Sequence, residues 1–233
     1  MTISFQEFPD GLSATKAVEQ QNVALIVPPA GRGIYRNVAK RLLDVTAIVL
    51  AAPVVVPLVA VLAAVVALDG GKPFYTQQRI GLHGRRFRMW KLRSMVPDAD
   101  SLMAEHLENH PAARAEWAVT QKLKNDPRIT RFGHVLRRSS LDELPQLWNV
   151  LTGDMSLVGP RPMMTNQQSM YPGTAYYRLR PGITGYWQTA GRNATTFEAR
   201  AGFDAAYDAD LSLATDVKVL AKTVGVVLKA TGY

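Results

Sequence analysis

Cysteine is absent from this chain of 233 residues. Its absence excludes disulfide bonds, thiolate metal sites and cysteine nucleophiles. It also fits a reducing, cytoplasm-facing location, where disulfides are rare. Hydrophobic residues make up 47% of the chain, which excludes wholesale disorder and suffices for one domain with a sizeable core.

Common nucleotide and metal motifs are missing as well. The chain contains neither G-x-G-x-x-G nor G-x-x-x-x-G-K-[ST], so a Rossmann or P-loop nucleotide site is not indicated. His106 and His110 lie four residues apart, but no Glu follows His106, so an exposed helix face is expected rather than a zinc motif. No helix-turn-helix, zinc or RNA-binding module is recognisable, which argues against nucleic acid as a partner.

Acidic residues are fewer than basic ones. The chain has 27 Lys and Arg against 19 Asp and Glu, a formal net charge of +8. This balance favours an anionic partner, such as nucleic acid, acidic lipid or a phosphorylated small molecule. Residues 1–33 lack the basic start and apolar run of a signal peptide and end in proline and glycine, so we expect a tail and linker there.

Charge is absent between Asp44 and Asp69, a run of about 24 residues. As one straight helix it would measure roughly 36 Å, enough to cross a hydrocarbon core of about 30 Å. A single spanning helix is therefore one interpretation of this run, and a core helix of a soluble protein is disfavoured at this length.

Two features favour a re-entrant helix instead. Pro53 and Pro57 lie inside the run, and each removes a backbone donor. Basic residues flank both ends of the run, and the positive-inside rule assigns such ends to the cytoplasmic face. They are Arg32, Arg36, Lys40 and Arg41 upstream, and Lys72, Arg79, Arg85, Arg86, Arg88, Lys91 and Arg93 downstream. We therefore expect residues 34–69 to form a helix-break-helix with its break at Ala52 and Pro53.

The rest of the chain, residues 70–233, predicts a mostly helical α+β domain. Short runs of β-branched and aromatic residues at 72–81 and 85–95 predict a small β-hairpin. Helical patterns follow at 97–110, 112–123 and 141–151, with a turn and a short extended piece at 125–133. The helical spacing of apolar residues at 211–229 predicts an amphipathic helix.

This last helix carries a basic stripe, formed by Lys218, Lys222 and Lys229. A basic amphipathic helix is typical of proteins at a membrane surface. Packing of the same helix on a protein core is the alternative, and the pattern alone does not decide between them.

Two adjacent acids, Asp142 and Glu143, follow the basic pair Arg137 and Arg138. The spacing Ser140-x-x-Glu143 matches a capping box, in which Glu143 only shapes the start of a helix. Two acids beside arginines would also suit Mg²⁺ and a phosphorylated substrate, and a carboxylate can attack phosphorus to form an acyl phosphate. Both interpretations stay open on these residues alone.

The motifs "KRLLDV", "FYTQQRIG", "FRMWKLRSM", "NDPRITRFGHVLRRSSLDELPQLWNVLTGDMSLVGPRP" and "RPGITGYWQTAGRN" follow one another in this order. Together with the apolar run they resemble the bacterial sugar transferases of the polyprenyl-phosphate glycosyl-1-phosphate transferase type, from about Lys40 to the C-terminus. The chain is most similar to the small members that start exopolysaccharide repeats with galactose 1-phosphate. That family commonly breaks its membrane helix at Ser-Pro, whereas this chain has Ala52-Pro53.

The resemblance implies a monotopic membrane protein with its active site at the cytoplasmic face of the bacterial inner membrane. Asp142 would be the nucleophile toward the sugar-bearing phosphate of a UDP-sugar, and Glu143 would help to hold Mg²⁺. The residues that match phosphate- or nucleotide-binding positions of the family are Lys91, Arg93, Arg137, Pro160, Arg161 and Arg192. Arginine contacts of this kind suit diphosphate recognition.

The expected reaction transfers sugar 1-phosphate to undecaprenyl phosphate and releases UMP, as the first membrane step of exopolysaccharide synthesis. UDP-galactose is the expected donor, and UDP-glucose or another UDP-hexose is the alternative. Membrane lipid, a homodimer and downstream glycosyltransferases are the further partners that the resemblance suggests. The alternative of another class is a non-catalytic, membrane-anchored basic protein that binds acidic lipid or nucleic acid.

Overall fold

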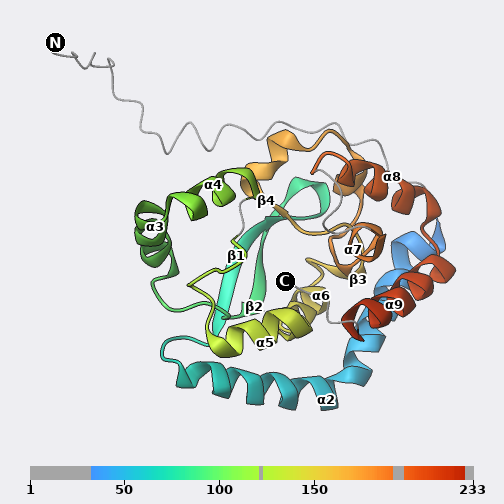
Figure 1. Cartoon of the computed structure of the whole chain (residues 1–233). Helices are drawn as coiled ribbons and strands as arrows, with labels where there is room; N and C mark the ends of the chain where they lie inside the picture. The colour runs from blue at the N-terminus through green and yellow to red at the C-terminus, as the bar shows by residue number, and fades with distance from the viewer. Residues whose placement is uncertain (1–32, 121–122, 191–196, 229–233) are drawn as a thin grey trace, which may run out of the picture.

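The computed structural model describes residues 33–120, 123–190 and 197–228. The predicted tail, apart from Gly33, therefore lies outside the described residues, as do Arg192 and Lys229. Helices dominate the described chain, and the strands are few and short (Figure 1). This confirms the predicted mostly helical α+β class.

The elements follow one another in this order. The first part has η1 (Tyr35–Ala39), α2 (Lys40–Leu68), β1 (Phe74–Ile80), η2 (Leu82–Gly84), β2 (Arg86–Leu92), α3 (Ala99–Asn109) and α4 (Pro111–Thr120). The middle has α5 (Arg131–Ser139), η3 (Leu141–Glu143), α6 (Gln146–Thr152), β3 (Ser156–Val158) and β4 (Met163–Met164). The last part has η4 (Thr165–Met170), η5 (Ala175–Arg178), β5 (Gly182–Thr184), α7 (Tyr186–Ala190), α8 (Arg200–Asp210) and α9 (Leu213–Leu228).

The predicted hairpin is formed by β1 and β2, which pair antiparallel from Phe74 opposite Leu92 to Ile80 opposite Arg86. Its turn places His83 and Gly84 at φ 56° and 75°, the left-handed region that tight hairpin turns require. Strand β4 adds to the free edge of β1 and completes a sheet of order β2-β1-β4. A second, parallel pair joins β3 to β5.

Helix α2 contains the whole uncharged run and is long and apolar enough to cross a membrane, with a mean hydropathy of 2.8 over its most apolar window. Large apolar side chains in its middle face outward, among them Leu50 and Val54, which are 76% and 73% exposed. Outward-facing side chains of this kind suit lipid rather than water.

The α-helix runs through Pro53 and Pro57 without the interruption that helix-break-helix implies. Both prolines lack an N–H, so the turn before each of them loses a hydrogen bond and is free to bend. Figure 1 shows the consequence, because the ribbon of α2 changes direction between its blue N-terminal part and its teal C-terminal part. The helix is bent, and its re-entrant course through a membrane stays a prediction.

Both halves of α2 pack against the same globular body. In the first half, Ile48 contacts a core that includes Val150 and Met155 near α6. In the second half, Val66 packs in a core with Leu92 and Leu136 from β2 and α5. The globular part therefore holds the helix near both of its ends.

The prediction for residues 125–133 was partly wrong. Ile129 forms an isolated bridge with Met95, but a helix rather than an extended segment begins at Arg131. The Thr130 side chain accepts a hydrogen bond from the Gly133 N–H at 2.9 Å and caps this helix, α5. Gly133 also lies against the Ser94 carbonyl, where a Cβ would come within 2.0 Å, so glycine lets α5 abut the chain just after β2.

Candidate active site

The acidic pair lies in a single 3₁₀ turn, η3, between helices α5 and α6. Ser140 ends α5 with φ +58°, a left-handed conformation that is uncommon for residues other than glycine. This reversal sets the direction of the following turn and places Asp142 inward, so that only 7% of the residue is exposed.

The capping-box interpretation was wrong. The Ser140 side chain makes no capping hydrogen bond to η3, because the residue acts as the left-handed end of α5. Helix α6 begins only at Gln146, after Pro145, so Asp142 and Glu143 precede it instead of forming its first turn. Neither acid belongs to the first turn of α6, and both carboxylates contact Lys91.

Strand β2 brings Lys91 to the two acids. Its ammonium Nζ lies 2.8 Å from Glu143 Oε1 and 3.4 Å from Asp142 Oδ2. Both ion pairs are partly shielded from solvent. The two carboxylates therefore face one common cation.

Burial has the largest effect on Asp142 and raises the pKa of its carboxyl group. The positive charge of Lys91 lowers the same pKa and partly opposes burial, whereas the negative charge of Glu143 raises it. Arg137 acts in the same direction as Lys91. The site thus contains a desolvated carboxylate whose ionised form depends on neighbouring cations.

Asn149 on α6 fixes the strand that carries Lys91. Its side-chain Oδ1 accepts the Trp90 N–H at 3.0 Å, and its Nδ2 donates to the Arg88 carbonyl at 2.7 Å. The side chain therefore replaces a neighbouring strand along this stretch of β2. Because α6 directly follows the acidic turn, Asn149 couples the position of Lys91 to that of Asp142.

A small cleft opens beside these groups and collects residues that are far apart in the sequence. Its lining consists of Arg79, Met89, Lys91, Glu143, Gln146, Arg161, Pro162, Gly182 and Ile183. Three of these residues are cationic and one is acidic, which favours an anionic ligand.

The sequence-predicted residues do not all meet at this cleft. Lys91, Glu143 and Arg161 line it, and Asp142 is in contact with Lys91. Arg137 has a buried Nη1 without a hydrogen-bond partner among the described residues, and its charge acts on Asp142. Buried Pro160 accepts the Gly182 N–H at 2.8 Å and fixes the loop next to Arg161.

Arg93 has a different setting. Its Nη2 donates to the Val66 carbonyl at 2.9 Å, so it holds the C-terminal end of α2 and does not line the cleft. Arg192 lies outside the described residues. For both arginines the role in phosphate binding stays a prediction.

Sequence reasoning missed Arg79, Gln146 and Asn149. The first two line the cleft, and Asn149 positions β2. Arg79 was counted only among the basic residues that flank the apolar run. The pairing of Tyr75 with Lys91 puts Arg79 on the same strand face as Lys91, but that pairing follows from the hairpin register and not from a motif.

The donor set of Asp142 and Glu143 fits a magnesium ion. Mg²⁺ is commonly held by one or two carboxylates, with phosphate oxygens and water completing its octahedral shell. Within the described residues no group of three or more His, Cys, Asp or Glu gathers to form a complete protein site. A metal here would therefore depend on oxygens of the substrate.

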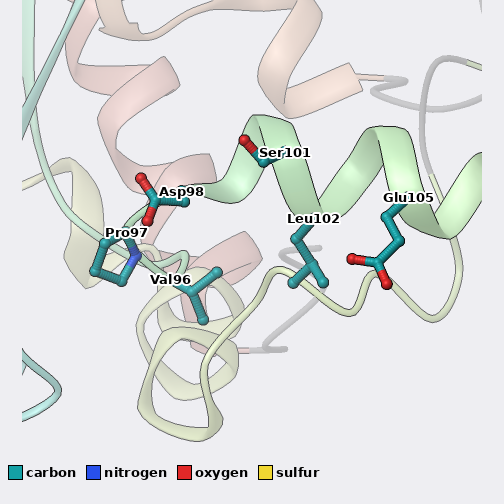
Figure 2. A pocket seen from close by; sticks show the side chains of 6 residues that line it. All are labelled: Val96, Pro97, Asp98, Ser101, Leu102 and Glu105. Carbon is teal, nitrogen blue, oxygen red and sulfur yellow. The ribbon is translucent and has the colours of Figure 1, made fainter.

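A second hollow, of about 340 Å³, lies at the start of α3 and is lined by Val96, Pro97, Asp98, Ser101, Leu102 and Glu105 (Figure 2). Its two ionisable side chains, Asp98 and Glu105, are both acidic. A phosphorylated ligand would be repelled there, so the smaller cationic cleft is the better candidate.

The family described as "Bacterial sugar transferase" matches residues 35–230 of the chain. The chain is 47% identical over 195 residues to a UDP-galactose-lipid carrier transferase of Erwinia amylovora, and 45% identical over 195 residues to an undecaprenyl-phosphate galactose phosphotransferase of Salmonella typhimurium. Both alignments cover 83% of this chain and 41% of the relative.

A third relative has a similar length. The exopolysaccharide production protein ExoY of Sinorhizobium fredii is 41% identical over 199 residues, which are 84% of this chain and 88% of ExoY. The match to the family covers α2, the acidic turn and the residues that line the cationic cleft. The chain therefore belongs to the bacterial sugar transferase family.

Proposed function

We propose that the protein transfers a sugar 1-phosphate from a UDP-sugar to undecaprenyl phosphate, releases UMP and so begins an exopolysaccharide repeat. The observation that carries the proposal is the buried Asp142 carboxylate in contact with Lys91, which lines the same cleft as Arg161. A nucleophile, a cation beside it and a phosphate-binding wall are the groups that phosphoryl transfer requires.

The reaction has two steps. In the first, an Asp142 oxygen attacks the sugar-bearing phosphorus, and the bond from that phosphorus to the UMP oxygen breaks, which leaves an aspartyl-phosphosugar. In the second, an oxygen of undecaprenyl phosphate attacks the same phosphorus, and the bond to Asp142 breaks, which restores the carboxylate. Each displacement needs only the ionised nucleophile, so Lys91 aids the first step by favouring the charged form of Asp142.

Magnesium is part of this proposal, held by Asp142 and Glu143 together with phosphate oxygens of the donor. When bound, it would offset negative charge on the diphosphate during the displacement. In the structure the Lys91 ammonium contacts both carboxylates and is the protein's own cation beside them.

The proposal places the catalytic body at the cytoplasmic face of the inner membrane, with α2 as a re-entrant anchor. Support comes from the two ends of α2. Near its start, Lys40 pairs with Asp216 at 2.6 Å, and near its end the Val66 carbonyl accepts a bond from Arg93. A helix that crossed the membrane would carry one of these ends away from the body that both contact. A homodimer and downstream glycosyltransferases remain the proposed protein partners.

Galactose is the proposed sugar because the names of the Erwinia and Salmonella relatives specify it. UDP-glucose differs at one epimeric hydroxyl and is the alternative donor.

The test uses the purified full chain with undecaprenyl phosphate, Mg²⁺ and a panel of UDP-sugars, and measures UMP release. We expect the highest kcat/KM with UDP-galactose, and a loss of about 10³-fold or more in kcat for Asp142→Asn. Full activity of Asp142→Asn would exclude it as the nucleophile. Absence of UMP release from every sugar would instead favour the non-catalytic alternative.

A further inference from the structure

Two arginines, Arg79 on β1 and Arg161 before β4, line the cleft together with Lys91. Burial, together with the positive charge of nearby Arg161, lowers the pKa of Arg79 from its usual value to about 10. Two guanidinium groups that lie close together and are partly shielded from water repel each other. A bound anion between them would offset this repulsion.

Arg79 makes hydrogen bonds only to uncharged groups among the described residues. Its Nη1 donates to the Pro162 carbonyl at 3.3 Å, and its Nη2 donates to Gln77 Oε1 at 2.5 Å. Its Nε is buried without a partner in the described chain. The ion pairs found among the described residues involve other basic side chains, so no carboxylate there offsets Arg79 or Arg161.

Contacts with Arg200 and Trp187 hold Arg161 in place. Arg200, only 5% exposed, donates from Nη2 to the Arg161 carbonyl at 2.6 Å. Both guanidinium groups lie against the Trp187 ring, at 5.7 Å for Arg161 and 5.2 Å for Arg200. The Arg161 backbone and side chain are thus fixed before any ligand binds, which lowers the entropy cost of binding.

The hairpin register gives the separation of Lys91 and Arg79 along the sheet. Tyr75 lies opposite Lys91, so Arg79 is four residues further along the same face of β1. Four residues of strand measure roughly 13 Å between backbones, and Met89 lies between them in the cleft lining. The cleft lining therefore carries one cation, Lys91, that contacts Asp142, and a second, Arg79, that lies further along the sheet.

We propose that Arg79 and Arg161 form a phosphate subsite opposite Asp142, which holds the UMP phosphate as it leaves and then the phosphate of undecaprenyl phosphate as it attacks. This inference rests on the proposed function. In an in-line displacement the attacking and leaving oxygens lie on opposite sides of phosphorus. Because Asp142 occupies one side in both steps, UMP and the lipid phosphate share the other side, and one pair of arginines serves both.

Arg79→Gln removes the charge and the guanidinium fork, and Arg79→Lys keeps the charge without the fork. Arg86→Gln is the matched control, because Arg86 is exposed on the same hairpin but opposite Ile80 and on the other face. The measurements are KM for the UDP-sugar, KM for undecaprenyl phosphate, and the inhibition constant of UMP. We expect all three to rise about 10-fold or more in Arg79→Gln and less in Arg79→Lys, and to stay unchanged in Arg86→Gln.

Two other outcomes would contradict the proposed subsite or its shared use. Unchanged values in both Arg79 variants would exclude the subsite. A rise for the UDP-sugar and UMP with an unchanged KM for undecaprenyl phosphate would exclude its shared use. If Arg79→Gln does not fold, Arg79→Lys carries the test, because loss of the fork alone should still raise all three values.

A separate experiment applies if the proposed function itself is wrong. If the wild-type protein releases no UMP from any UDP-sugar, inorganic pyrophosphate is added and the melting temperature is measured. A rise in the wild-type protein that is lost in Arg79→Gln would retain the anion site without the reaction. Absence of a rise in the wild-type protein would exclude the anion site as well.

Discussion

Lys91 and Glu143 are separated by 52 residues in the chain, yet the lysine Nζ lies 2.8 Å from the Glu143 Oε1. The same ammonium reaches Asp142 at 3.4 Å, so one cation joins β2 to the acidic turn. This contact is the link between the hairpin, which carries the basic wall of the cleft, and the carboxylate proposed to attack phosphorus. It also makes the ionisation of Asp142 depend on Lys91.

Lys91→Met is expected to move the acidic limb of the pH profile of kcat/KM. In the proposed reaction Asp142 attacks in its ionised form, so activity should fall as pH drops through its pKa. Burial already raises that pKa, and Lys91 lowers it. Removal of Lys91 should therefore shift the acidic limb to higher pH. The control is Lys218→Met, a change at an exposed lysine of α9. An unchanged acidic limb in Lys91→Met would contradict the expectation.

Asn149→Ala should lower kcat for UMP release by about 10- to 100-fold, with a smaller change in KM. The substitution removes both side-chain bonds to β2, at Trp90 and Arg88, and lets Lys91 move relative to Asp142. Asn149→Asp keeps the acceptor for Trp90 and should recover part of the rate. Thr152→Ala at the exposed end of the same helix is the control, and wild-type kcat in Asn149→Ala would show that the strand needs no such tether.

Gly182→Ala should lower the melting temperature by several degrees. A Cβ at Gly182 would lie 2.1 Å from the Gly159 nitrogen and 2.4 Å from the Thr184 carbonyl oxygen, where backbone cannot easily move. Overpacking of this kind costs about 1–3 kcal/mol. Gly202→Ala provides the contrast, because nothing lies within 4 Å of its Cβ in α8, so its melting temperature should stay the same or rise. Equal values for the two variants would contradict this.

Asp204→Asn should remove a pH dependence of stability. Burial raises the pKa of Asp204 to about 6, while Tyr171 donates a hydrogen bond to its carboxyl at 2.8 Å. The folded pKa lies above the unfolded value, so the stabilising effect is complete below about pH 4 and is lost as pH rises to about 6.

The loss amounts to about 2–3 kcal/mol, since each pKa unit corresponds to roughly 1.4 kcal/mol. Over this pH range the wild-type melting temperature should therefore fall relative to that of Asp204→Asn. Glu198→Gln, a change at an exposed carboxyl, is the control and should follow the wild-type protein. A constant difference between Asp204→Asn and the wild-type protein across the range would show that Asp204 ionises as it does in the unfolded chain.

Single cysteines test the course of α2, because the natural chain has none. Gly33→Cys and Lys72→Cys mark positions shortly before and shortly after α2, and Val54→Cys marks its exposed apolar middle. In a re-entrant arrangement a membrane-impermeant maleimide labels positions 33 and 72 from the cytoplasmic side alone and leaves position 54 unlabelled. Labelling of positions 33 and 72 from opposite sides would establish a spanning helix.

Local sequence patterns predicted the helices and strands that depend mainly on neighbouring residues. The uncharged run predicted α2, and the paired short β-branched and aromatic runs predicted the hairpin of β1 and β2. The family motifs also singled out Asp142 and Glu143, which the structure places together with Lys91. The capping box failed because the same spacing fits two local conformations, and Pro145 together with the left-handed Ser140 decided against the helical one.

The sequence by itself determined that this chain has an apolar helix, a basic balance of charge and an adjacent pair of acids, because each of these depends on neighbouring residues. Only the tertiary structure decided which cations face those acids. Arg79 and Arg161 are 82 positions apart and line one cleft because β4 pairs with β1. The face that a side chain takes follows from strand register and packing, which no run of neighbouring residues contains.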